Sequence, residues 1–300
     1  MDTAPSRHTA TNGRAAILVA AVAWSLAGLG QRGLDATPAT QVAGRALFAF
    51  LALLVVVAVT ERSGIIRSFR ALGRDGFVLA VFLAISSGTF LLALNYTSVA
   101  NVLFLQAASP MMAALLGWVL LSERISRRTW IAMLMAAVGV AAMVVGSFDA
   151  GTLAVVLPIV MTASFAIVIV IARHRRDVSM MPATCASQAL VLVVVVPFAS
   201  FATATTRDWE IFFALGVFQM GFGLALLTFG ARVLPPAEVA LLSLLEVVLG
   251  PLWVWLAYSE RPSTATLVGG AVVTAAVVVQ ATAGSEPAAS VELLAVPVHD

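Results

Sequence analysis

Lysine is absent from this 300-residue chain, and charge of either sign is scarce. All 17 basic residues are arginines, set against 15 acidic residues, and charged residues make up only 11% of the sequence. A soluble domain carries about a quarter charged residues, and a nucleic-acid-binding surface gathers its basic residues on one face. Here the arginines fall in short clusters between long apolar runs. The composition therefore excludes an ordinary soluble domain and predicts no nucleic-acid partner.

Cysteine and histidine are also rare, which removes several kinds of chemistry. Cys185 is the single cysteine, so the chain forms no internal disulfide. The three histidines, His8, His174 and His299, lie in predicted tails or a loop. No His-Glu-x-x-His, Gly-x-Ser-x-Gly or Walker A pattern occurs. We therefore expect no catalytic residue, no metal site, no cofactor and no enzyme activity, and ATP drive is unsupported unless a separate subunit supplies it.

Apolar sequence is what the chain has in abundance. Hydrophobic residues make up 61% of it, and its mean hydropathy is +1.02. A helix that crosses about 30 Å of hydrocarbon needs ~20 apolar residues. Ten runs are long enough: 15–34, 38–60, 76–94, 98–121, 127–147, 151–172, 181–204, 209–230, 236–258 and 264–282. The sequence predicts an all-α integral membrane protein with ten transmembrane helices.

The placement of the arginines predicts how these helices are oriented. Cytoplasmic loops carry an excess of arginine and lysine. A cytoplasmic N-terminus places thirteen arginines inside and three outside (Arg32, Arg207 and Arg261), with Arg45 inside a span. The first run resembles a signal peptide, but it exceeds the usual 7–15 apolar residues of one, and we expect a retained helix. The predicted location is the inner (cytoplasmic) membrane, with several passes and both termini in the cytoplasm.

An internal repeat explains why only one of two similar segments carries extra arginines. Trp-x-x-x-Ser-Glu-Arg occurs at 118–124 and again at 255–261, and a shift of 137 positions aligns 95–145 with 232–282 without a gap. Five spans per half is an odd number, so the halves insert upside down relative to each other. Only the inner copy is followed by Arg127 and Arg128. Ser126 and Ser263 are predicted N-caps of the fifth and tenth helices.

These segments resemble a known family. The stretch ALNYTSVANVLFLQAASPMMAALLGWVLLSERISRRTWIAMLMAAVGVAAMV is similar to the signature half of the drug/metabolite transporter superfamily, EamA type, and GARVLPPAEVALLSLLEVVLGPLWVWLAYSERPSTATLVGGAVV to its second half. The resemblance covers about 15–282. It implies a ten-helix exporter or permease of small metabolites, with its pathway between the halves and helices five and ten peripheral. The two halves differ at one important position: Val247 in the second half aligns with Pro110 in the first. The proline of the second half lies four residues later, at Pro251.

The resemblance and the repeat together predict the domain organisation. We expect a cytoplasmic tail at 1–13, a first EamA-like five-helix repeat at 14–148, a second at 149–283, and a cytoplasmic tail at 284–300. The tails are polar or of low complexity, and we expect them to be poorly ordered.

Polar side chains inside the spans are the candidate substrate-binding residues. A charge near the bilayer centre costs about 2.5–3.5 kcal/mol, so such groups face protein or water. The candidates are Trp24, Arg45, Asn101, Gln106, Gln188, Gln219 and Glu246. Arg45 and Glu246 together suit a zwitterion; in the alternative, they pair with each other to hold the halves together. Pro110 and Pro251 are predicted gate hinges, since each removes a backbone hydrogen bond.

Other features of the sequence favour structural roles. Glu123 and Glu260 are expected to brace helix ends through the neighbouring Arg124 and Arg261. The segment GLGQRG at 28–33 matches a dinucleotide-binding pattern by letters, but it ends an apolar helix and no strand precedes it. We expect its glycines to permit close helix packing instead.

The sequence as a whole predicts a secondary transporter that exports small metabolites by alternating access. Amino acids or similar zwitterionic or amphipathic compounds fit the charges inside the spans. Three alternatives stay open: a channel, a lipid-modifying membrane enzyme, and a permease for another class such as nucleotide sugars or drugs. The expected partners are a small-molecule substrate and the lipid bilayer, and a homodimer stays open.

The orientation is testable with reporter fusions. Fusions after Arg74 and Arg128 are expected to report a cytoplasmic position, and fusions near Arg207 and Arg261 an external one, because arginines accumulate on the inner side. Paired alkaline phosphatase and green fluorescent protein reporters distinguish the two sides. A cytoplasmic position at Arg261 contradicts the inverted repeat.

Overall fold

The protein is an all-helical bundle in its computed structural model, which describes residues 7–60, 64–122, 125–145, 150–174, 180–234 and 236–283. No strand occurs in these residues. Ten helical segments within them are long and apolar enough to cross a membrane. The predicted class, an all-α membrane protein with ten spans, is confirmed. The predicted tail at 284–300 and residues 1–6 lie outside the described part.

Ten spans are built from thirteen α-helices because two spans are interrupted and one helix is short. The helices are α1 (Arg7–Arg32), α2 (Pro38–Thr60), α3 (Ile65–Ala71), α4 (Gly73–Tyr96), α5 (Val99–Ala107), α6 (Ser109–Leu121), α7 (Arg127–Val145), α8 (Thr152–His174), α9 (Met180–Val195), α10 (Thr206–Phe213), α11 (Gly223–Val233), α12 (Pro236–Tyr258) and α13 (Thr264–Ala283). Helices α5 and α6 form the fourth span. The eighth contains α10, the π-helix η4 (Ala214–Phe222) and α11.

The ends of several helices differ from the predicted ones. Helix α1 begins at Arg7, within the segment expected to be a poorly ordered tail. The helix therefore starts several residues before the apolar run that crosses the membrane. Helix α9 ends at Val195 rather than near 204. Two 3-10 turns follow, and Pro197 in the first lacks the N–H that would continue the α-helix. The short helix α3 is an addition that hydropathy does not predict.

The two halves repeat each other in backbone detail. Ser122 and Ser259 begin the two Ser-Glu-Arg triplets, and both are left-handed, with φ of 54° and 55°. Ser126 and Ser263 each accept a hydrogen bond from the backbone N–H three residues on, at 3.1 Å in both copies. The predicted N-caps are confirmed, and the alignment of the halves extends to their local geometry.

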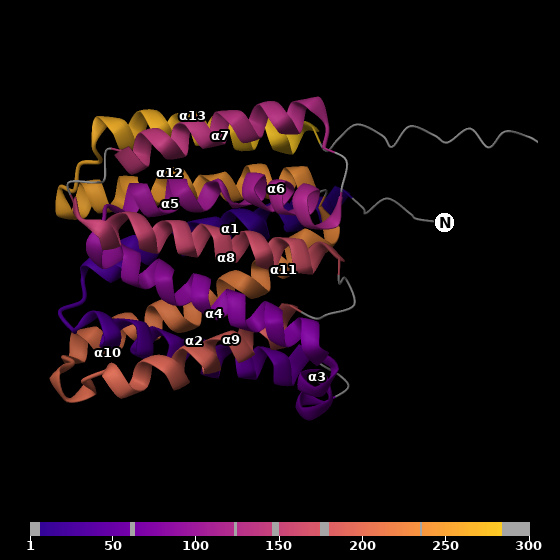
Figure 1. Cartoon of the computed structure of the whole chain (residues 1–300). Coiled ribbons are helices and arrows are strands. Elements are labelled where there is room, and N and C mark those ends of the chain that lie inside the picture. The colour runs from indigo at the N-terminus through magenta and orange to yellow at the C-terminus, as the bar shows by residue number, and fades with distance from the viewer. Residues whose placement is uncertain are drawn as a thin grey trace, which may run out of the picture.

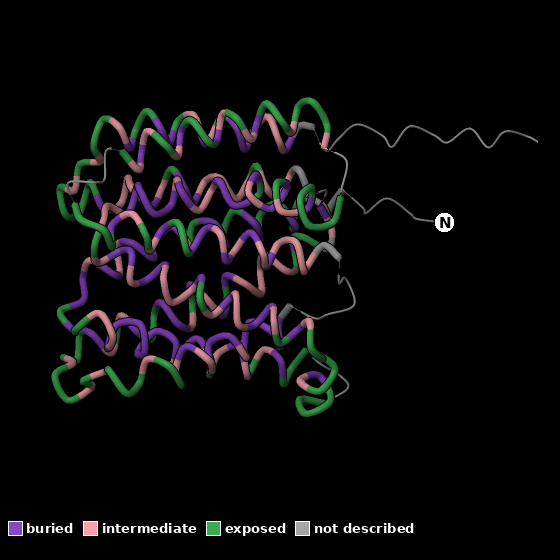
Figure 2. Tube along the Cα trace, viewed as in Figure 1, coloured by how far each residue is buried: buried purple, intermediate pink, exposed green. Residues whose placement is uncertain are grey.

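Helices α7 and α13 form an outer layer of the bundle, at the top of Figure 1. They pack on each other, and α13 also contacts α5. Large apolar side chains face outward on them and on other outer helices, among them Val55, Leu134 and Val193. Exposed positions recur along the outer helices in Figure 2. This surface suits lipid contact, and the peripheral position implied for helices five and ten is confirmed.

Glycines allow the closest helix contacts. A Cβ atom at Gly28 would lie 2.4 Å from a methyl carbon of Val99, and one at Gly30 would lie 2.9 Å from Leu215. The prediction that these motif glycines serve helix packing is confirmed. Between α7 and α13 the neighbouring atom is backbone rather than side chain, because a Cβ at Gly139 would lie 2.6 Å from the carbonyl oxygen of Gly269.

Enlarging Gly139 is expected to separate α7 from α13. In a Gly139→Leu variant the new side chain meets backbone, which cannot move aside as a flexible side chain does, so we expect a loss of about 1–3 kcal/mol of stability. Thermal unfolding in detergent measures the change. Gly88→Leu is the control, because a Cβ at Gly88 meets nothing within 4 Å. Equal midpoints for the two variants contradict the prediction.

Candidate functional site

A cavity of about 470 Å³ lies among helices from both halves of the chain. Helices α1, α5, α6 and α8 contribute to its lining, and so do α11, α12 and α13. It extends from the middle of the bundle, at Trp24 and Glu246, towards Ala231 near the end of α11 and Val239 near the start of α12. The Arg14–Glu238 ion pair lies at this same end, where α1 and α12 begin. The cavity therefore reaches towards one end of the bundle.

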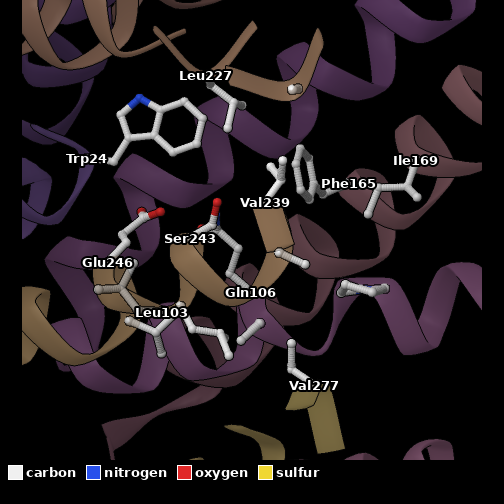
Figure 3. A pocket seen from close by; sticks show the side chains of 16 residues that line it. Trp24, Leu103, Gln106, Phe165, Ile169, Leu227, Val239, Ser243, Glu246 and Val277 are labelled. Atoms are coloured by element: carbon white, nitrogen blue, oxygen red, sulfur yellow. The ribbon is translucent and has the colours of Figure 1, made fainter. Parts of the chain in front are cut away.

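One face of α12 provides the polar part of the cavity wall. Val239, Ser243 and Glu246 are spaced four and three residues apart, which places them on the same side of a helix. Figure 3 shows the oxygens of Ser243 and Glu246 directed towards the side on which Trp24 lies. Glu246 is only 8% exposed. Within the described chain, no side chain forms a hydrogen bond or ion pair with its carboxylate.

Trp24 forms the opposite wall, and a glycine fixes its position. Its indole Nε1 is buried, with no hydrogen-bond partner among the described residues. A Cβ at Gly223 of α11 would lie 2.5 Å from Nε1. The absence of a side chain at Gly223 therefore makes room for the indole ring.

Pro110 lies where the fourth span breaks. The span is interrupted at Ala108, between α5 and α6, and Pro110 has no N–H to donate to the carbonyl oxygen of Gln106. The Ser109 hydroxyl donates to that oxygen instead, at 2.6 Å. Gln106, Ala107 and Pro110 all line the cavity, so the break is part of its wall.

The second predicted hinge differs from the first. Pro251 lies inside α12, which continues from Pro236 to Tyr258, and it does not line the cavity. The predicted asymmetry between the two prolines is confirmed. Pro158, inside α8, was not singled out in the sequence, and Thr162 donates a hydrogen bond to its carbonyl oxygen.

The structure separates Arg45 from the cavity. Arg45 is 4% exposed and donates to Oε1 of Gln219 through Nη2 at 2.8 Å and through Nε at 3.2 Å. Gln219 lies on the π-helix η4, a rare conformation that is frequent at functional sites. Arg45 and Glu246, both described residues, are near enough to attract each other but form no ion pair. The pairing considered from the sequence is therefore not formed in this structure.

Two further candidates also lie outside the cavity lining. Asn101, close to the start of α5, donates from Nδ2 to Thr97 Oγ1 at 3.1 Å, while its buried Oδ1 has no partner among the described residues. Gln188 donates to the hydroxyl of Ser187 at 3.2 Å. Of the nine predicted site residues, the cavity brings together Trp24, Gln106, Pro110 and Glu246.

At the other end of the bundle, an ion pair joins three segments. Arg32 at the end of α1 donates through Nε to Glu260 Oε2 at 2.7 Å. It also donates to the carbonyl oxygens of Leu94 and Thr97, while Glu260 accepts from the Val99 N–H at 2.8 Å. We call this group of bonds the Arg32–Glu260 clasp. It ties α1 and the α12–α13 loop to the turn between α4 and α5.

The clasp corrects the predicted partner of Glu260, and the clasp itself was not predicted from the sequence. Glu260 does brace helix ends, but through Arg32 rather than Arg261. Glu123 and Arg124 lie outside the described residues. In the orientation predicted from the arginines, Arg32, Glu260 and the α4–α5 turn all lie on the outer side of the membrane, and this shared side was the available signal. Ser243 was also missed, although its spacing of three from Glu246 places it on the same helix face.

The described residues contain ten helical segments long and apolar enough to cross a membrane, in two similar halves with a cavity among their helices, and this arrangement is typical of an integral membrane transporter. Comparisons with known proteins agree. The model of the EamA-like transporter family matches residues 11–145 and 152–282, one match in each half. The chain belongs to this family, which is part of the drug/metabolite transporter superfamily.

Solved structures support the fold. A crystal structure of a protein 16% identical to this chain matches it with a TM-score of 0.63, over 92% of this chain and 99% of that one. At this identity the match concerns the fold alone. No curated protein matches the chain.

Restoring the missing hydrogen bond at Pro110 is expected to slow transport. Alanine supplies an N–H for the Gln106 carbonyl oxygen and lets α5 and α6 join into one stiffer helix. We expect Pro110→Ala to lower the transport rate several-fold while the folded yield changes little. Pro158→Ala is the control, because Pro158 lies in an unbroken helix outside the cavity lining. Unchanged kinetics in folded Pro110→Ala protein reject the hinge.

Proposed function

We propose that the protein is a secondary transporter that exports small metabolites by alternating access across the cytoplasmic membrane. Its substrates are amino acids or similar zwitterionic or amphipathic compounds. One observation carries the proposal: the cavity reaches towards one end of the bundle, and the clasp ties the helices together at the other. A site open to one side and closed to the other is the basic requirement of alternating access.

The arginine distribution gives this asymmetry a direction. Helix α3, which carries Arg67 and Arg70, and the Arg14–Glu238 ion pair lie at the end towards which the cavity reaches (Figure 1), and the positive-inside rule assigns that end to the cytoplasm. The clasp then faces the outside. In this orientation the cavity receives its substrate from the cytoplasm, as an exporter requires.

The composition of the cavity supports a small amphipathic substrate. Its lining combines apolar side chains, such as Leu103 and Phe165, with a few polar groups from Gln106, Ser243 and Glu246. Ligand pockets are commonly about 300–1,000 Å³ and mostly apolar, with a few polar groups that fix orientation. A volume of about 470 Å³ fits a molecule of amino-acid size.

The clasp is suited to act as an outer gate. Its bonds are charge-assisted, which makes them stronger than bonds between neutral groups. Both side chains are also partly exposed, at 25% and 21%, so water is at hand to replace each partner when the bonds break. A partly exposed ion pair of this kind is stable enough to close a pathway and weak enough to reopen during transport.

Weakening the clasp is expected to open the cavity to the outside. The probe is Ser243→Cys in a Cys185→Ser background, labelled in intact cells with a membrane-impermeant maleimide. Adding Glu260→Gln removes the charge that holds Arg32. We expect the rate of labelling from outside to rise several-fold, because the outward-open state becomes more populated.

The matched control is Glu238→Gln, which removes the ion pair at the opposite end of the bundle. It is expected not to raise labelling from outside. Unchanged labelling in folded Glu260→Gln protein refutes the clasp as an outer gate. Counterflow in proteoliposomes then separates the alternatives: a transporter shows trans-stimulation, a channel shows none, and an enzyme leaves a changed product.

A further inference from the structure

Glu246 is the only ionisable residue among the sixteen that line the cavity. The other polar groups of the lining are the Gln106 amide, the Ser243 hydroxyl and the Trp24 indole. No arginine contributes, since Arg45 is occupied by Gln219 and lies outside the lining. Among the described residues of the lining, a ligand therefore meets one acid and no base.

The carboxylate of Glu246 has no partner in the described chain. Buried carboxylates are normally paired or hydrogen-bonded, because an isolated charge in an apolar environment is costly. Arg45 donates to Gln219 instead, so it leaves the hydrogen-bonding capacity of the two carboxylate oxygens unsatisfied. A cationic ligand supplies what is missing, namely a charge and N–H donors directed at the carboxylate.

The surroundings of Glu246 match the shape of an ammonium group. The hydroxyl of Ser243 lies on the same helix face, beside Glu246, and gives the ammonium a second acceptor (Figure 3). The indole of Trp24 stands on the opposite wall, and a tryptophan ring attracts cations. Leu103, Phe165 and Leu227 form the remaining apolar walls, which suit the body of such a molecule.

A free carboxylate on the ligand has no comparable place. The lining offers no cation to neutralise it, and in a small apolar cavity it would be repelled by Glu246. For a zwitterionic amino acid, the unfavourable binding free energy of the carboxylate therefore offsets the favourable contribution of the ammonium group.

We infer that the cavity selects primary amines with an apolar body and no free carboxylate, and that Glu246 and Ser243 bind the ammonium group. The inference rests on the proposed transport function. Of the substrate classes named there, it retains amphipathic compounds that carry a positive charge and excludes the zwitterionic amino acids. Glu246 is then the specificity-determining residue of the site.

Three compounds of nearly equal shape test this selection. Phenylethylamine carries the ammonium alone, phenylalanine adds a carboxylate, and 2-phenylethanol replaces the ammonium with a neutral hydroxyl. Binding to purified protein in detergent is measured by isothermal titration calorimetry. We expect phenylethylamine to bind at least about tenfold more tightly than either of the others, which corresponds to 1.4 kcal/mol.

Two variants assign the selection to Glu246. Glu246→Gln keeps the size of the side chain and removes its charge, and it is expected to reduce the preference for phenylethylamine to less than about twofold, a difference of ~0.4 kcal/mol. Glu238→Gln removes an acid of the same helix outside the cavity lining and is expected to retain the full preference. A third variant, Ser243→Ala, is expected to weaken phenylethylamine binding, because the second acceptor for the ammonium group is lost.

Three results overturn the inference. They are equal or tighter binding of phenylalanine to the wild type, an undiminished preference in folded Glu246→Gln protein, and no binding of phenylethylamine at millimolar concentration. The first does not depend on whether any variant folds. The proposed transport function is judged separately, by maleimide labelling at position 243 and by counterflow of other metabolites, so the two proposals fail independently.

Discussion

The hydrocarbon core of a bilayer supplies no hydrogen-bond donors or acceptors, so each polar group of this chain at membrane depth needs a partner within the protein. Helical backbone meets this need for the peptide groups. Side chains meet it locally: Trp253 donates to Ser25 at 3.0 Å, Thr162 donates to the Pro158 carbonyl, and Arg45 is held by Gln219. Against this background the unpartnered groups are informative. Among the described residues, the Glu246 carboxylate and the Trp24 Nε1 belong to the cavity lining, while the unpartnered oxygens of Gln31, Asn101 and Gln280 lie outside it.

The fold was largely predictable because its main signals are local or repeated. Apolar runs of about twenty residues predict spans, and the paired Ser126 and Ser263 predict helix starts that the structure contains. Helix ends were less predictable, since hydropathy reports where lipid contact ends and not where the helix ends. Helix α1 accordingly begins at Arg7, ahead of its apolar run, and α9 ends at Val195, before its apolar run does.

The candidate site was predictable only in part, for a different reason. The sequence identifies polar groups within spans but does not show which spans are neighbours. Glu246 and Trp24 meet in the cavity because α1 packs against α12, whereas Arg45 lies against η4 because α2 packs there. The clasp shows the same limit, as Glu260 has an arginine next to it in sequence and pairs with one 228 residues away. Ser243 is a different case: it was missed, although its position relative to Glu246 follows from periodicity along one helix and needs no knowledge of other helices.

The contact between Gly223 and Trp24 places a glycine directly behind one wall of the cavity. A Cβ at Gly223 would lie 2.5 Å from the indole nitrogen, so even alanine there would push the ring away from α11 and towards the space that a ligand fills. Gly223 is not among the lining residues, yet its lack of a side chain is what allows Trp24 to take its position in the wall. A single methyl group at this remote position is therefore a means of engineering a narrower substrate range without altering any residue of the cavity wall.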